Sequence, residues 1–233
     1  MPTLGRTGLS NHLMLLFEMS RRLLSTLALS ALGALTACGA VRAPEPPAFQ
    51  MGAEAAKARA KTDSLRYPYT AADISFMTGM IHHHAQAIVI SSWAESHGAS
   101  PAVQRLTGRI INSQTDEITL MSTWLGDRNQ PVPDMDHSAH GGQGAVMPGM
   151  LTPAQLDTLG AARGARFDQI FLTYMIQHHR GAVAMVRTLF SNHGAGQNET
   201  IFKFASDAEV DQSTEIRRML QMLLELDVPP TSK

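Results

Sequence analysis

The sequence predicts an all-α fold, an antiparallel four-helix bundle made of two duplicated helical hairpins. A repeat is the first observation: residues 76–87 return as residues 171–182, with seven of the twelve positions identical, among them Phe, Thr, Met, Ile and two adjacent His. The second observation is that apolar residues recur at helical spacing in both halves. The third is that short turns separate the long segments, which favours antiparallel packing of neighbouring helices.

Residues 1–38 are predicted to be a signal peptide of the bacterial lipoprotein type. A pair of Arg precedes an apolar run at 23–37, which is too short to span a bilayer. The run ends in Leu-Thr-Ala before Cys38 and resembles a lipobox, so we expect Cys38 to be lipidated; a chance Cys beside an ordinary export signal is the alternative. Met19 is a more natural start of translation. We therefore expect a lipid-anchored protein on the periplasmic or extracytoplasmic face of a bacterial cell envelope, with the anchor as its membrane contact.

Composition limits the chemistry that the protein can perform. The 233 residues carry a net charge of −1 without a cluster of Lys and Arg, so nothing indicates a nucleic-acid partner. The single Cys leaves neither a disulfide nor a thiolate zinc site to stabilise the fold. Any metal would be held by His, Met and carboxylates, and the 14 Met offer soft thioether ligands as well as core packing.

The bundle is expected over residues 67–228, after a flexible tether at 39–66 that is rich in Pro and Ala. The first hairpin is predicted at 70–126. Thr70 as N-cap and Asp73 three residues later match a capping box, which predicts the start of its first helix.

Later helix starts follow a related rule, an N-cap residue with Pro directly after it. Ser100 begins the second helix and Thr152 the third in this way. A loop rich in Met and His at 127–151 is expected to join the hairpins. The second hairpin is predicted at 152–227, with a kink in its first helix near 160–164, where two Gly occur.

The repeated His pairs predict a metal site. At the helical period, Met80 and His84 share one side of the first helix, as Met175 and His179 do in the second copy, and this side lies within the apolar face. A buried imidazole needs a partner at each polar nitrogen. Four imidazoles meeting in one core are easier to explain with a metal than without one.

We predict six metal ligands: Met80, His83, His84, Met175, His178 and His179. Each His has an alternative role as a core residue satisfied by hydrogen bonds, and His83 and His178 lie at the face edge, where they could point to solvent. Each Met could serve only in core packing. His82 becomes Gln in the second copy, so we expect a surface residue there.

Polar residues near these ligands are expected to orient them, with a solvated or capping role as the alternative. They are Asp73, Asp168, Gln114, Glu117, Gln212 and Glu215. The loop carries a possible second site of His and thioether ligands, which suit copper in either oxidation state. Its residues are Met135, His137, His140, Met147 and Met150; a polar linker that happens to contain them is the alternative.

These features resemble the bacterial family called domain of unknown function 305. The family hallmark is Met-Ile-x-His-His followed by a small residue, which matches residues 80–87 and 175–182; the Phe-Asp-x-x-Phe-Leu approach to the second copy matches 167–172. The resemblance covers residues 69–226 and implies a ferritin-like bundle. Members are often exported and some are linked to copper binding and tolerance, so the resemblance implies periplasmic copper handling.

The predicted function is copper binding in the cell envelope, with sequestration or delivery of Cu(I) or Cu(II) and no catalytic residue. A ferritin-like di-iron oxidoreductase is an alternative, although such sites need Glu-x-x-His and Met stands at the Glu position before His83 and His178. Zinc as the metal and a homodimer stay open. A helical interaction module without metal, whose His pairs pack or respond to pH, is the third alternative.

Overall fold

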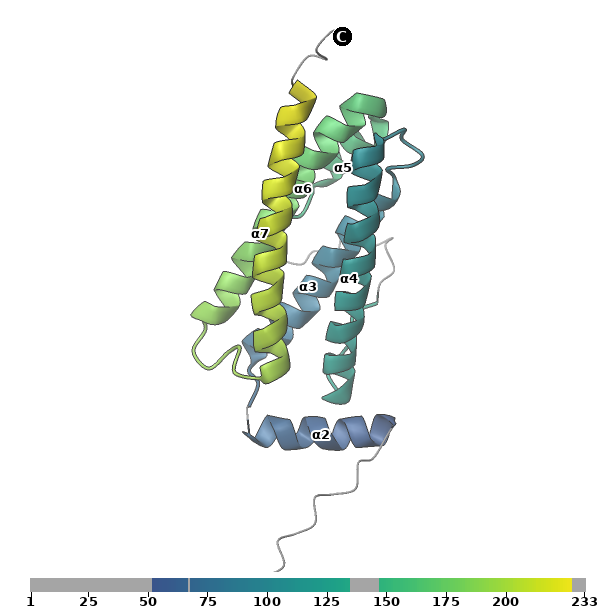
Figure 1. The fold of residues 1–233 in the computed structure, drawn as a ribbon. Helices are drawn as coiled ribbons and strands as arrows, with labels where there is room; N and C mark the ends of the chain where they lie inside the picture. The colour runs from purple at the N-terminus through teal and green to yellow at the C-terminus, as the bar shows by residue number, and fades with distance from the viewer. Residues whose placement is uncertain (1–51, 67, 135–146, 228–233) are drawn as a thin grey trace, which may run out of the picture. The chain divides into compact units, whose positions relative to one another are not determined.

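The fold is built from helices alone in the residues that the computed structural model describes, which are 52–66, 68–134 and 147–227. This confirms the all-α prediction. The helices in chain order are α2 (Ala53–Arg66), α3 (Ala71–Ser92), α4 (Pro101–Asp127), α5 (Pro153–Ala161), α6 (Gly164–Ser191) and α7 (Glu199–Asp227) (Figure 1). The predicted signal peptide with Cys38 lies outside the described residues, and so do Met135, His137 and His140 of the loop.

Helices α3 and α4 form the first hairpin. The predicted capping box is present, because the Thr70 side chain accepts from the backbone N–H of Asp73 while the Asp73 carboxylate accepts from that of Thr70. Ser100 caps α4 through its side chain, with Pro at the first turn as predicted. Helix α3 ends at Ser92, and a turn closed by Gly98 at φ +68° leads into α4.

The second hairpin contains a break where the sequence predicted a kink. Thr152 forms a capping box with Gln155 at the start of α5, but α5 ends at Ala161 and α6 begins at Gly164. Gly164 adopts φ +56°, and its N–H donates to the carbonyl of His97 in the other hairpin at 2.8 Å. In a continuous helix this N–H would form an intrahelical hydrogen bond; the break frees it to bind the other hairpin.

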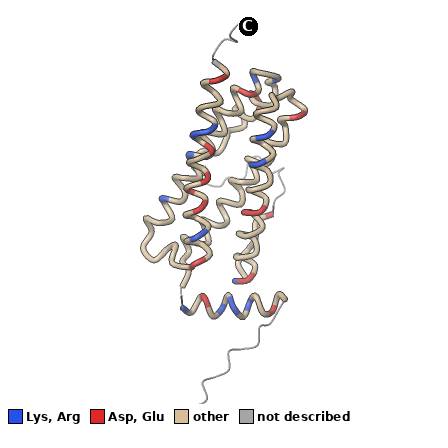
Figure 2. Tube along the Cα trace, in the orientation of Figure 1, with Lys and Arg blue, Asp and Glu red and all other residues tan. Residues whose placement is uncertain are grey.

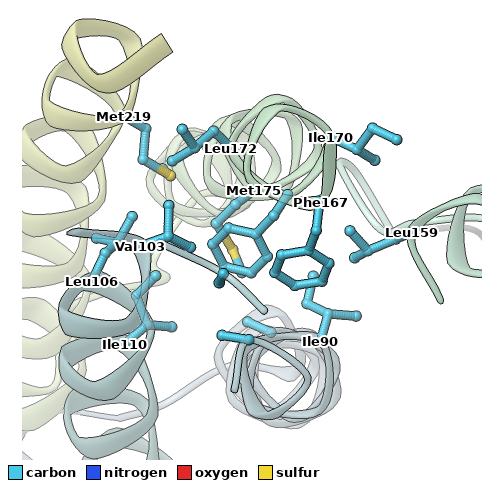
Figure 3. Close-up of a cluster of buried hydrophobic side chains, with 14 of the residues drawn as sticks. Ile90, Val103, Leu106, Ile110, Leu159, Phe167, Ile170, Leu172, Met175 and Met219 are labelled. Atoms are coloured by element: carbon cyan, nitrogen blue, oxygen red, sulfur yellow. The ribbon is translucent and has the colours of Figure 1, made fainter. Parts of the chain in front are cut away.

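The hairpins join mainly along α3 and α6, while α4 packs against α3 and α7 against α6 (Figure 1). Two apolar clusters fill the interior. One surrounds Phe167 and Phe171 and includes Met175 and Leu159 of α5 (Figure 3). The other contains Met77 and Met80. Full burial of each large apolar side chain contributes about 1.5–3 kcal/mol, so these clusters hold α3 and α6 side by side.

Two buried carboxylates tie each hairpin to the turn of the other. Asp73 on α3 accepts from the N–H of Gly196 at 2.7 Å, and Asp168 on α6 accepts from the N–H of Ser100 at 3.2 Å. Both Asp are essentially inaccessible to solvent. The ties are reciprocal, so they fix the two copies of the repeat in equivalent positions.

Part of the predicted tether is helical. Residues 53–66 form α2, which contacts α4 and buries Ala55 and Ala60. Ala has the highest helix propensity of the amino acids, and the Ala-rich composition of this segment explains why this part of the tether is helical.

Charged residues of both signs occur on α2, α4 and α7, as Figure 2 shows. None of the helices in the described ranges combines the length and the hydropathy that crossing a membrane requires.

Candidate metal centre

Helices α3 and α6 bring four His side chains together, each with no exposed surface. We call this group the histidine quartet: His83, His84, His178 and His179. The rings of His83 and His178 contact across the two helices with centroids 3.7 Å apart. Within each helix the neighbouring rings are 6.3–6.4 Å apart. His82 is exposed, as the sequence predicted.

Each of the outer two imidazoles is held by a carboxylate. The Nε2 atom of His84 lies 2.5 Å from Oε2 of Glu117 on α4, and that of His179 lies 2.6 Å from Oε2 of Glu215 on α7. A carboxylate only accepts, so Nε2–H donates and the lone pair is left on Nδ1. The two Glu side chains are about one-fifth exposed and link the buried rings to solvent.

The inner two imidazoles differ in their partners. Nε2 of His83 donates to the carbonyl of Pro148 at 3.1 Å, while neither ring nitrogen of His178 has a partner. Across the quartet, all four Nδ1 atoms are buried without a hydrogen bond. Buried polar groups are normally paired, so this concentration of unpaired nitrogens requires an explanation.

The inner imidazoles are neutral. Burial, followed by the charge of His84, lowers the pKa of His83 to about 3. Burial and the neighbouring His83 lower the pKa of His178 well below its usual value. A neutral imidazole has a free lone pair, which is the form that binds metals.

Negative charge gathers at the solvent side of the quartet. Besides Glu117 and Glu215, the exposed Asp211 lies on α7. Partial desolvation, and then the charges of Glu117 and other nearby carboxylates, raise the pKa of Asp211. Asp211 was not predicted, because its counterpart in the repeat is Ser113 and the duplication gave no signal there.

The other predicted site residues have the following places. Met80 and Met175 are fully buried, each in a different apolar cluster. The carboxylates of Asp73 and Asp168 bind the backbone groups described above, and each lies ten residues, about 15 Å along its helix, before the nearest quartet residue. Gln114 and Gln212 are buried, with Oε1 unpaired in both.

The described part of the predicted loop site is a segment that crosses α3 and α6. Met147 and Met150 are partly buried. A side chain added at Gly79 of α3 would meet the Met147 sulfur at 3.3 Å and Met185 of α6 at the same distance. Met185 was not predicted, since its counterpart in the first copy is Ile90.

The donor chemistry of the quartet fits a metal ion, but its rings are not arranged around one point. Within the described ranges, no three His, Cys, Asp or Glu side chains converge as a preformed metal-ligand group. The inner pair, whose ring planes are tilted by 41° to each other, would have to rotate to share an ion. His178 has no hydrogen bond to lose in such a rotation.

Comparison with known proteins gives matches over most of the bundle. The family model described as "Domain of unknown function (DUF305)" matches residues 73–223. A DUF305 protein from Streptomyces coelicolor, provisionally described as secreted, is 28% identical; the match covers 70% of this chain and 98% of that chain, with a TM-score of 0.58.

Structures of a protein called CopM are also similar. Its Cu(I)-bound form is 30% identical, with 67% of this chain and 98% of that chain covered and a TM-score of 0.53. Its Cu(II)-bound form is 32% identical, with 66% and 96% covered and a TM-score of 0.54. CopM has also been solved with bound Ag.

One curated relative, the uncharacterized protein L153 of Acanthamoeba polyphaga mimivirus, is 38% identical over 56 residues. That match spans 24% of this chain and 37% of the viral protein's length. The family match is much broader, since it takes in both copies of the His pair and all four long helices. On this ground the chain belongs to the DUF305 family.

Proposed function

We propose that this protein binds copper on the histidine quartet and sequesters or delivers it in the cell envelope. The observation that carries the proposal is the set of four buried Nδ1 atoms without partners. Each unpaired buried nitrogen costs about 1–3 kcal/mol, a cost that ligation would remove. CopM, which shares the family, has been solved in Cu(I)-bound and Cu(II)-bound forms.

The residues around the quartet would act as orienting groups. Histidines that bind metals usually donate their second ring N–H to a carboxylate or carbonyl, which fixes the tautomer. Glu117, Glu215 and the carbonyl of Pro148 occupy this position for three of the four rings. The two carboxylates would also offset the positive charge of a buried ion, since an uncompensated buried charge is costly.

Copper is favoured over zinc by the Met residues that precede the His pairs in the sequence. Imidazole suits both metals, whereas thioethers select Cu(I). Met80 and Met175 precede the His pairs by three residues on the same helices, and we retain both as ligand candidates. Ag, which CopM also binds, shares the preference of Cu(I) for soft ligands.

A second copper site in the loop is a separate proposal. It consists of the predicted residues Met135, His137, His140, Met147 and Met150. The side chains of Met147 and Met185 both lie next to Gly79 of α3. This pair of Met side chains supports a thioether site where the loop reaches α3. Loss of one copper equivalent on changing Met147 and Met150 to Leu, with the quartet intact, would support this second site.

Lipidation at Cys38 is proposed to anchor the protein on the periplasmic or extracytoplasmic face of the cell envelope. Cys38→Ser should release the protein from the membrane fraction of the producing bacterium. If the variant sediments with membranes as the unchanged protein does, the lipid anchor is refuted while the copper proposal is unaffected.

The copper proposal is tested by metal analysis of the purified protein after loading with Cu(I), Cu(II), Zn(II) or Fe(II) and desalting. We expect stoichiometric copper in the unchanged protein and loss of at least one equivalent when His178 and His179 are both changed to Ala. The matched control changes the exposed His82 and His193 to Ala and should retain all copper. Stoichiometric zinc or iron with no copper would contradict the proposal.

A further inference from the structure

A short backbone segment covers the inner pair of the quartet. This strap, residues 147–151, contacts His83 directly through the Pro148 carbonyl. Gln86 of α3 holds its end with two hydrogen bonds, accepting from the N–H of Leu151 at 2.8 Å and donating to its carbonyl at 3.1 Å. Gln177 of α6 donates to the carbonyl of Gly149 at 3.3 Å. The strap is therefore fastened to both copies of the repeat.

The strap also lies directly on the α6 backbone. A Cβ at Gly181 would lie 1.9 Å from the Pro148 carbonyl oxygen, and one at Gly149 would lie 2.7 Å from the carbonyl oxygen of Gln177. Any side chain at Gly181 would displace the strap, because the atoms it meets are backbone rather than a flexible side chain.

The repeat itself reflects this arrangement. The four His of the quartet stand at positions that are identical in both copies. The copies differ at five equivalent positions, and at three of these one of the two residues contacts the strap: 79 with 174, 82 with 177, and 86 with 181. Gln86 and Gly181 are equivalent positions, one binding the strap by its side chain and the other by having none. The chain has one strap but two copies of the repeat, so the strap cannot make the same contacts with both copies. The two copies therefore differ in sequence at the positions that contact the strap.

We propose that the strap gates access to the His83–His178 pair. Both rings are fully buried, so an ion must displace either the strap or the packed helices. Leu151 at the end of the strap is buried in the apolar cluster around Phe167, but residues 147–150 are held only by a few hydrogen bonds and partial burial. Helices α3 and α6 are anchored by two apolar clusters, and weakly held segments open first. This inference rests on the proposed metal site and adds that strap opening sets the rate of metal exchange.

The test uses two variants that loosen the strap in different ways, Gln86→Ala and Gly181→Ala. Their controls are Gln104→Ala, which removes a Gln bonded to the carbonyl of Ala99, and Gly108→Ala, where a Cβ meets open space on α4. The first readout is transfer of Cu(I) from loaded protein to a chromophoric chelator. Each Gln86 bond is worth about fivefold in the opening equilibrium, so Gln86→Ala should release Cu(I) roughly 25-fold faster, and both controls should stay within about twofold.

A second readout needs no metal. In the apo protein, the Leu151 amide should exchange with deuterium faster in both strap variants, and diethyl pyrocarbonate should modify His83 and His178 faster than in the controls. Unchanged Cu(I) release together with faster Leu151 exchange would overturn the gate. If the unchanged protein binds no copper, the proposed function fails, and the labelling rates alone decide the gate: equal labelling in variants and controls would refute it.

Discussion

Two carboxylates fix the orientation of the outer rings of the quartet. Glu117 and Glu215 each accept from Nε2–H of a His on a neighbouring helix, which directs Nδ1 inward. Their place at the boundary between buried rings and solvent gives them two effects on a bound ion, control of the imidazole tautomer and partial neutralisation of charge.

Glu117→Gln should therefore weaken copper binding. The amide can present its nitrogen to Nε2 and removes the negative charge, so we expect about a 10–100-fold loss of affinity, in line with such orienting partners elsewhere. Competition with a chromophoric chelator at pH 7 measures it. The control is Glu209→Gln, which removes a carboxylate that forms a surface ion pair with Arg187. Surface ion pairs contribute little, so this change should alter copper affinity little.

The depressed pKa values of the inner His make apo stability depend on pH. The unfolded pKa is 6.5 and the folded pKa of His83 is about 3, so the unfolded state binds more protons between these values. The contribution of this neutral, buried ring to the free energy of unfolding is thus fully present above pH 6.5 and is lost as the pH falls toward 3. Between pH 7 and pH 5 His83 should cost about 2 kcal/mol of unfolding free energy. His178, whose pKa is also lowered by burial, should add a loss of the same sign.

Urea unfolding of the apo protein at pH 7 and pH 5 checks this expectation. His178→Gln should reduce the difference between the two pH values by about half, since one of the two groups is removed, whereas His193→Gln at an exposed position should leave it unchanged. A difference that His178→Gln does not alter would mean that burial of this ring does not control the pH response.

At the scale of the helices, the reciprocal ties of Asp73 and Asp168 keep the two hairpins in register. Asp168→Ala should leave the N–H of Ser100 unpaired and cost about 1–3 kcal/mol of unfolding free energy. Asp73→Ala should cost more, because that carboxylate also completes the capping box of α3. Chemical denaturation measures both, with the exposed Asp157→Ala on α5 as the control; equal, small effects at all three positions would contradict the ties.

Helix starts were accessible from sequence because their signals are local. The caps at Thr70, Ser100 and Thr152 depend on a few neighbouring residues and are present as predicted. The two Gly predicted a kink near 160–164, but not a full break before Gly164, because the group that compensates for the break is the carbonyl of His97, more than sixty residues away. The same limit applies to the strap, whose main contact with the quartet is a backbone carbonyl without any sequence signature.

The candidate site was only partly visible in the sequence for a related reason. Helical period placed His84 and His179 toward the interior, but left the direction of His83 and His178 open. These two are buried because α3 and α6 pack side by side and bring the rings into contact. That contact depends on the relative rotation of two helices in different hairpins, which single-helix periodicity does not contain.

At the scale of the whole molecule, the duplication gives two nearly equivalent halves. His84 with Glu117 in one half matches His179 with Glu215 in the other. We therefore expect His84→Ala and His179→Ala to weaken copper binding to a similar extent, within about threefold of each other given the spread of such contributions. Loss of binding in one variant only would show that the halves do not share one site.

The central claim, that copper binds through Nδ1 atoms of the quartet, is tested most directly by NMR of the protein labelled with ¹⁵N at His. Cu(I) is diamagnetic, so the ring nitrogens remain observable in the loaded protein. We expect the Nδ1 resonances of the quartet to shift on loading while Nε2 of His84 and His179 stays protonated. Stoichiometric Cu(I) binding with all quartet resonances unchanged would contradict it.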